Sequence, residues 1–253
     1  MEIEGAALVI IAIAALLTSV LSAVAGLGGG VILLLVIAQF VAPTTAIPIQ
    51  GAIQLASNGS RAGLLRRDVD WSVVGWSSLL MLPGSLLGVL VATSLPEDTI
   101  RVMLAVFVLV LAWRPSLLKP TPPPGVADDE TPTRRPMLLA LGASSGFLNS
   151  TVGASGPVTS PFLKAVTATH VAFVATAAAS QVIAHISKLI AFSADGWRIS
   201  DHVAVIAIGI VGVIVGTKIG TTLLPKIAAR RLDTIFKIVL TSLAIRLLFT
   251  AAT

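Results

Sequence analysis

Long apolar runs separated by short polar segments set the pattern of this chain. Residues 5–25, 44–65, 71–95 and 168–193 are each long enough to cross a bilayer as a helix, which takes about 20 residues. Residues 99–113 form a shorter apolar run. A membrane β-barrel would instead show alternating segments of about ten residues. The pattern therefore predicts an all-α polytopic membrane protein.

Two glycine-containing breaks interrupt this pattern. The first, Gly-Leu-Gly-Gly-Gly at residues 26–30, precedes a short apolar run at 31–41. The second, at residues 149–157, lies between apolar runs at 137–152 and 157–166. Glycine unwinds a membrane helix or lets another backbone approach, and broken helices in corresponding positions mark binding sites in transporters. We therefore expect a broken hairpin at each position.

The second half of the chain repeats the first at an offset of 127 residues. The matched residues follow one another in the same order in both halves, which favours an internal duplication. The pairs are Gly26 with Gly153, Gly29 with Gly156, Gln54 with Gln181, Asn58 with His185, Arg61 with Lys188, Asp68 with Asp195 and, as the offset grows by one or two, Gly84 with Gly212, Gly88 with Gly216 and Pro96 with Pro225. Both late glycine pairs have the G-xxx-G spacing that suits close helix packing.

Corresponding loops of the two halves carry opposite charge. Residues 66–67 are both arginine, whereas the partner loop near Asp195 has only Arg198 nearby. The turn at 96–98 is acidic, whereas residues 226–231 contain three basic side chains. Because basic loops stay on the cytoplasmic side, the two halves should have opposite orientations in the membrane. This places both chain termini outside.

The expected fold is thus two inverted repeats, each a broken glycine-containing hairpin plus three transmembrane helices, about eight helical spans in all. The first repeat covers residues 1–118 and the second covers 137–253. Residues 119–136 between them are rich in proline and charge and form a cytoplasmic linker.

Composition agrees with a membrane protein. Of the 253 residues, 55% are hydrophobic and 11% are charged, against about 25% charged in soluble domains. The net charge of +5 is explained by the basic loops, so no nucleic-acid partner is expected. The chain has no cysteine, which excludes disulfides and thiolate metal sites. The first apolar run follows an acidic start, unlike a signal peptide, and is expected to stay in the mature protein.

Polar residues within the spans are the candidates for a binding site. Gln50, Gln54, Asn58 and Arg61 share one helical face, and residues 181–188 repeat that stripe. Carboxylates are concentrated in loops and at the termini, which argues against carboxylate cation sites and buried acidic proton relays. The N-termini of half-helices attract anions. This inventory favours a small oxyanion as the ligand, with no cofactor and no metal ion.

The candidate substrate-binding residues come from both breaks and both polar stripes: Gly28, Gly29, Gly30, Gln50, Gln54, Asn58, Asn149, Ser150, Thr151, Ser155, Gly156, Gln181 and His185. Arg61 and Lys188 are candidates for electrostatic attraction, although both lie near span ends and can snorkel to an interface. The glutamines can also serve only to bridge helices. His185 is either a coupling proton carrier or a neutral histidine bonded to a neighbouring helix.

The inverted halves, the glycine cluster at 26–30, the Gly153–Gly156 element followed by Pro161, and the G-xxx-G third spans resemble the sulfite exporter TauE/SafE family. The resemblance covers nearly the whole chain outside the linker. It implies a secondary transporter of sulfite, organosulfonates or similar anions in the bacterial inner membrane, and not an enzyme. The expected partners are the substrate and the lipid bilayer. A coupling proton or sodium ion and a homodimer are left open.

Two alternatives remain at this point. Gly153-Ala154-Ser155-Gly156 is similar to the nucleophile motif of rhomboid intramembrane proteases, for which His185 would be the base. The residues after this histidine do not follow the rhomboid spacing, and the first break has no corresponding serine. The other alternative is an anion channel on the same fold.

Overall fold

The computed structural model describes residues 5–25, 29–118, 121–122, 134–223 and 229–252, and the regular structure in these ranges is helical. The elements are α1 (Gly5–Ala25), α2 (Gly29–Ile37), α3 (Pro43–Leu64), α4 (Trp71–Ser78), α5 (Met81–Ser94), α6 (Glu97–Trp113), the short 3₁₀ helix η1 (Pro115–Leu118), α7 (Arg134–Thr151), α8 (Gly156–Val166), α9 (His170–Ala194), the 3₁₀ helix η2 (Ile199–His202), α10 (Val203–Leu223) and α11 (Ala229–Ala252).

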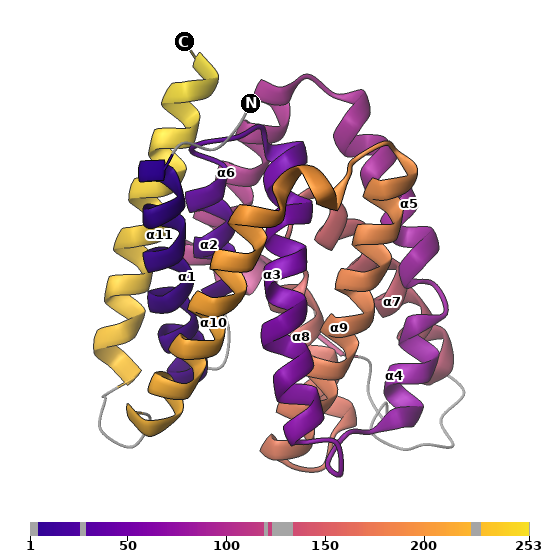
Figure 1. The fold of residues 1–253 in the computed structure, drawn as a ribbon. Helices are drawn as coiled ribbons and strands as arrows, with labels where there is room; N and C mark the ends of the chain where they lie inside the picture. Colours follow the sequence, from indigo (N-terminus) through magenta and orange to yellow (C-terminus); the bar gives the residue numbers. More distant parts are fainter. Residues whose placement is uncertain (1–4, 26–28, 119–120, 123–133, 224–228, 253) are drawn as a thin grey trace.

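The helices form a bundle with α3 and α9 at its centre (Figure 1). On one side of this central pair, α1 packs along α10, and α11 packs along α6. On the other side, α5 packs along α7. The start of α1 and the end of α11 lie at the same end of the bundle (Figure 1). Elements from the two halves of the sequence are therefore interleaved throughout.

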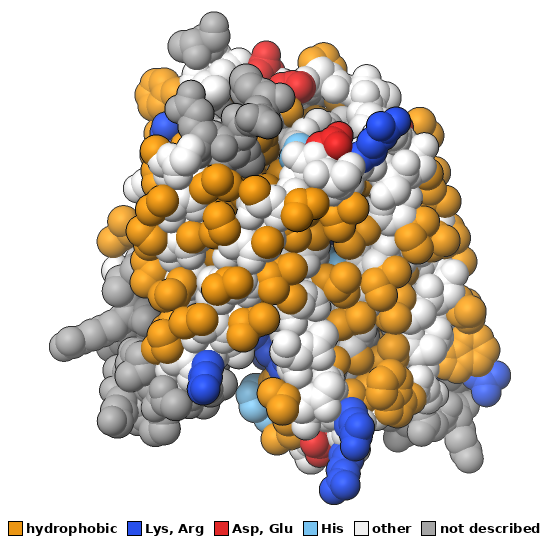
Figure 2. Space-filling view, in the orientation of Figure 1, with side chains coloured by type: hydrophobic (Ala, Val, Ile, Leu, Met, Phe, Trp, Pro, Cys, Tyr) orange, Lys and Arg blue, Asp and Glu red, His pale blue; other side chains and the backbone are white. Residues whose placement is uncertain are grey.

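The surface is banded by residue type. Hydrophobic side chains cover the middle of the face shown in Figure 2, whereas most Lys and Arg side chains lie at its lower end and most acidic ones at its upper end. Large apolar side chains are exposed on several helices, among them Leu17 of α1, Leu90 of α5 and Val211 of α10. Soluble monomers rarely expose continuous apolar areas of this kind. A lipid-facing belt with charged ends explains the distribution.

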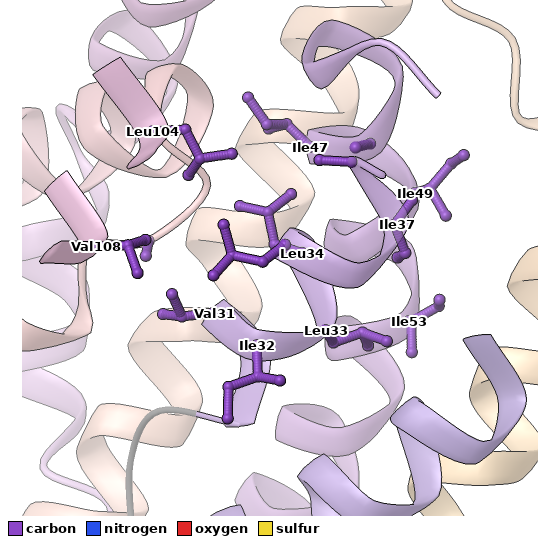
Figure 3. Packing of buried hydrophobic residues seen from close by; sticks show 14 of the residues in the cluster. Val31, Ile32, Leu33, Leu34, Ile37, Ile47, Ile49, Ile53, Leu104 and Val108 are labelled. Atoms are coloured by element: carbon purple, nitrogen blue, oxygen red, sulfur yellow. The ribbon is translucent and has the colours of Figure 1, made fainter. Parts of the chain in front are cut away.

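Helix α2 lies inside the bundle. Its side chains are apolar on every side, and all of Val31–Leu35 are buried. Figure 3 shows them packed against Ile47 and Ile53 of α3 and against Leu104 and Val108 of α6. A helix that is hydrophobic all round is one that is buried all round. The short run after the first break thus forms the half-helix that the sequence predicted.

Glycines let α5 and α10 pack closely against α7 and α1, the helices that lead into the two breaks. A Cβ at Gly84 or Gly88 on α5 would collide with backbone carbonyls of α7, and one at Gly212 or Gly216 on α10 would collide with carbonyls of α1. The prediction that both G-xxx-G pairs serve close packing is confirmed. Gly142 and Gly146 of α7 make equally close contacts with α4 and α5.

Two boundaries differ from the sequence prediction, and fewer described helices than predicted are long and apolar enough to span a membrane. The run at 71–95 is not one straight helix, because α4 and α5 meet at a bend of 45°. The helix α7 begins at Arg134, inside the predicted linker, where Arg134 Nη2 lies 3.6 Å from Asp70 Oδ2. By length and composition, His170–Ala194 and Ile199–Ile219 could each cross a membrane, and the bent pair adds a third crossing among the described residues. Helix α3 has the length, but its polar residues lower its hydropathy.

Candidate functional site

Helices α3 and α9 bring the two polar stripes together at the centre of the bundle. They run in opposite directions, so Gly51 lies against Lys188 while Asn58 lies against His185. Gly51 has no side chain, and the Lys188 side chain lies directly against its backbone. A glycine on one helix therefore makes the room that a long cationic side chain on the other helix occupies.

Lys188 is the centre of the site. Its side chain is 0% exposed, and Nζ donates to Gln50 Oε1 and to Asn149 Oδ1, both at 3.0 Å. These partners come from α3 and α7, so three helices meet at one ammonium group. The interpretation that this lysine snorkels to an interface is wrong, because glycine and amide groups hold it inside the protein. The two amide oxygens solvate the ammonium group but carry no compensating charge.

Hydrogen bonds extend from Lys188 to both glycine breaks. On one side, Gln50 Nε2 donates to the carbonyl of Gly30 at 3.2 Å. On the other side, Asn149 Nδ2 donates to Gln181 Oε1 at 3.3 Å, and Gln181 Nε2 donates to Ser155 Oγ at 3.1 Å. A continuous series of hydrogen bonds thus joins the start of α2 to Ser155, the residue that precedes α8.

The second break is shaped by its backbone. Gly153 has φ of +69°, a conformation that favours glycine, and a Cβ there would collide with Leu34 of α2. Ser155 is fully buried, and Ser145 Oγ donates to its Oγ at 2.9 Å. The turn at Gly153 therefore presses the second break against the half-helix that follows the first.

His185 forms the other contact across the helix pair. Asn58 Nδ2 donates to the Gln54 carbonyl at 3.1 Å and lies 3.3 Å from His185 Nε2. With Nε2 as the acceptor, the imidazole proton is on Nδ1, which is buried without a partner among the described residues. The hydroxyls of Ser150 and Ser180 are also buried and unpartnered in that part of the chain. Such groups are costly to bury unless a ligand or water satisfies them.

The remaining predicted site residues differ in their positions and in their hydrogen-bond partners. Gln54 Nε2 lies beside Gly30, 2.6 Å from where a Cβ would be. Gly29 begins α2 and Gly156 begins α8, whereas Gly28 lies outside the described residues. The Thr151 hydroxyl donates to the Phe147 carbonyl at 2.8 Å, within its own helix.

Three buried residues of α3, α7 and α9 were not among the predicted site residues. Ser145, Ser180 and Gly51 are respectively a bonded hydroxyl, an unpartnered hydroxyl and the glycine beneath Lys188. Ser145 lies four residues before Asn149, and Gly51 lies three residues before Gln54. Residues at these spacings share a helical face, so the positions of Ser145 and Gly51 were a usable signal. Arg61 is half-buried near the end of α3.

Comparison with known proteins decides the family. The family model described as "Sulfite exporter TauE/SafE" matches residues 11–247, which is nearly the whole chain. The chain belongs to the TauE/SafE family. The resemblance seen in the sequence is thereby confirmed. No curated protein and no solved structure matches the chain.

TauE/SafE proteins are membrane transporters and not enzymes, and the protein is integral to the membrane. The geometry agrees in disfavouring the protease alternative. The Ser155 hydroxyl is bonded to Ser145 and Gln181, while His185 Nε2 faces Asn58. A nucleophile and its base need to be within hydrogen-bond reach of one another, and these two residues have other partners.

Proposed function

We propose that the protein is a secondary transporter that moves small sulfur-containing oxyanions, such as sulfite or organosulfonates, across the bacterial inner membrane by alternating access. Membership of the TauE/SafE family gives the class, and one observation supports the rest of the proposal. A fully buried lysine, held by neutral amides, lies on a hydrogen-bonded chain that links both helix breaks.

The substrate is proposed to bind beside Lys188, between the two breaks. The first backbone N–H groups of α2 have no helical carbonyl to donate to and lie at the positive end of the helix dipole. At the start of α8 the Gly156 N–H adds one more donor, because Pro157 has no N–H and the Val158 N–H donates to the Ser155 carbonyl at 3.0 Å. The hydroxyls of Ser150 and Ser180 and the Nδ1 of His185 add buried donors that are unpartnered within the described ranges. A sulfonyl group has several acceptor oxygens, which suits a site made of donors.

Alternating access is proposed to follow from two inverted repeats, residues 1–118 and 137–253. If α1–α6 correspond to α7–α11, the pair α1–α10 corresponds to the pair α7–α5, and both pairs are packed. Asn58 and His185 are equivalent positions in the two repeats, and they contact each other at 3.3 Å. Two equivalent residues touch only close to the axis that relates them. Exchange of conformations between such repeats exposes a central site to each side in turn.

The orientation and the linker are proposed from charge. The lower end of the bundle in Figure 1 receives the basic loop after α3, and Figure 2 shows most Lys and Arg side chains at that end. Under the positive-inside rule this end faces the cytoplasm. Residues 119–136 would then connect the repeats on the cytoplasmic side.

The test is a counterflow measurement in proteoliposomes. Vesicles are loaded with unlabelled sulfite, methanesulfonate, sulfoacetate, taurine, thiosulfate or sulfate. Uptake of the same compound in labelled form is compared with uptake by liposomes that contain no protein. A carrier accumulates label transiently against the same unlabelled compound, whereas a channel only equilibrates it. Transient accumulation with at least one of these compounds is expected. The proposal would be overturned if none of the compounds entered faster than it enters liposomes without protein. Equilibration without transient accumulation would favour the channel.

A further inference from the structure

We infer that the binding site accepts ligands with a single negative charge and rejects dianions of the same shape, because Lys188 is its one counter-charge. This inference rests on the proposed function and adds a rule for the substrate class. It sorts candidate substrates by net charge: hydrogen sulfite and organosulfonates with a single net negative charge, such as methanesulfonate, fit, whereas sulfate, sulfoacetate and other dianions do not.

The charge inventory of the described interior supports this rule. Three ionisable side chains are buried there: Arg134, His185 and Lys188, at 5%, 3% and 0% exposure. Arg134 forms an ion pair with Asp70 where α7 begins. His185 Nε2 faces an amide nitrogen, which leaves its imidazole neutral. Lys188 has two amide oxygens as partners and no carboxylate among the residues described.

The geometry of the ammonium group leaves one donor for a ligand. An ammonium group has three N–H donors, and Gln50 and Asn149 take two of them. Each of these amides uses its own NH₂ group elsewhere, on Gly30 and Gln181. Gln50 and Asn149 are therefore positioning residues that fix the direction of the third Lys188 N–H. That bond brings one positive charge to the ligand.

Charge balance then separates anions that shape cannot separate. A monoanion beside Lys188 makes the occupied site neutral overall. A dianion of the same size leaves one buried charge without compensation, and an unpaired buried charge is strongly unfavourable. Neutral donors such as hydroxyls and backbone N–H groups lessen this penalty but cannot remove it. We expect the dianion to bind at least about 100-fold more weakly.

The first experiment compares three ligands that share a tetrahedral sulfur group, using the purified full-length protein. Methanesulfonate is a monoanion, sulfate is a dianion, and dimethyl sulfone is neutral. Binding is measured by calorimetry at constant ionic strength. Methanesulfonate should bind at least about 100-fold more tightly than either of the others. Equal affinity for methanesulfonate and sulfate would overturn the charge rule and leave the proposed transport intact.

The second experiment alters the charge without altering the shape. Asn149→Asp keeps an oxygen for Lys188 and supplies its missing counter-charge, while the Gln181 amide can turn to donate to the new carboxylate. The variant should be at least as heat-stable as the wild type and should lose methanesulfonate binding by about 100-fold or more. Gln39→Glu makes the same change from amide to carboxylate outside the network, where Gln39 Nε2 donates to the Leu35 carbonyl at 3.0 Å. This variant should bind methanesulfonate normally.

These outcomes are distinct from a failure of the proposed function. Normal methanesulfonate binding by a folded Asn149→Asp protein would overturn the inference, whatever the protein transports. Absence of binding for all three ligands together with absence of counterflow would remove the proposed function, and the inference with it. The comparison of ligands on the wild-type protein decides the charge rule even if the variant does not fold.

Discussion

The contact between Gly51 and Lys188 gives the sharpest prediction about the site. Gly51→Ala adds a single methyl group in the middle of α3. Its Cβ would lie 3.1 Å from Lys188 Nζ and closer still to Cε. Non-bonded carbon atoms need about 3.5–4.0 Å, so Cε must move by roughly 1 Å. Both hydrogen bonds of Nζ are 3.0 Å long and cannot both survive such a shift.

The expected magnitude combines two opposing effects. Alanine stabilises a helix by about 1 kcal/mol relative to glycine. The loss of one hydrogen bond to a charged group costs about 1.5–3 kcal/mol. The free energy of unfolding should therefore fall by about 0.5–2 kcal/mol. Because the displaced ammonium group no longer points at the ligand, anion binding should weaken by about 10- to 100-fold.

The matched control is Gly59→Ala on the same helix. Nothing lies within 4 Å of a Cβ at Gly59, so this variant should gain the helix propensity and bind the anion normally. Thermal unfolding of each purified variant, with and without methanesulfonate, measures both quantities. A Gly51→Ala protein that matched Gly59→Ala in stability and in the ligand-induced shift would refute the packing of Lys188 against α3.

Three further experiments test the glycine break, Ser155 and the membrane topology. Gly156→Val should abolish uptake in proteoliposomes while the protein still inserts and purifies. Gly212→Val should lower the free energy of unfolding by about 1–3 kcal/mol, measured by thermal unfolding, and leave ligand selectivity unchanged. Ser155→Ala should keep partial transport, since one hydrogen bond is worth about 1 kcal/mol; complete loss would indicate a larger role. An impermeant reagent added outside should label a single cysteine at Asp98 but not a single cysteine at Arg230. Labelling of both from the same side would contradict the inverted repeats.

Much of the fold was predictable because the membrane allows few structures. A backbone in lipid must satisfy its own hydrogen bonds, so long apolar runs can only be helices. The half-helix at 29–37 followed from a run too short to cross the bilayer. The bend between α4 and α5 was not predicted, because the apolar pattern continues through Leu79 and Leu80. Pro83 explains it: proline has no N–H to donate to the Leu79 carbonyl, and its ring clashes with that carbonyl. A proline three or four residues after the bend was therefore a local signal of it.

The site was predictable in its composition and not in its centre. Gln50, Asn149 and Gln181 were selected as polar residues in apolar spans, and the structure brings them into one network. Lys188 was placed at the periphery because it lies near the end of its span in sequence. Its burial depends on Gly51, which lies on another helix 137 residues away. Tertiary contacts of this kind cannot be read from the periodicity of one helix.

The most direct test of the central claim is the uptake of a labelled anion by proteoliposomes that contain Lys188→Met. Methionine has a similar length and no charge, so it removes the ammonium group while filling most of its space. Uptake should fall by about 100-fold or more, with the protein inserted and folded. Lys164→Met, which removes an exposed lysine of α8, should transport normally. Wild-type uptake by Lys188→Met would contradict the claim that this buried lysine binds the transported anion.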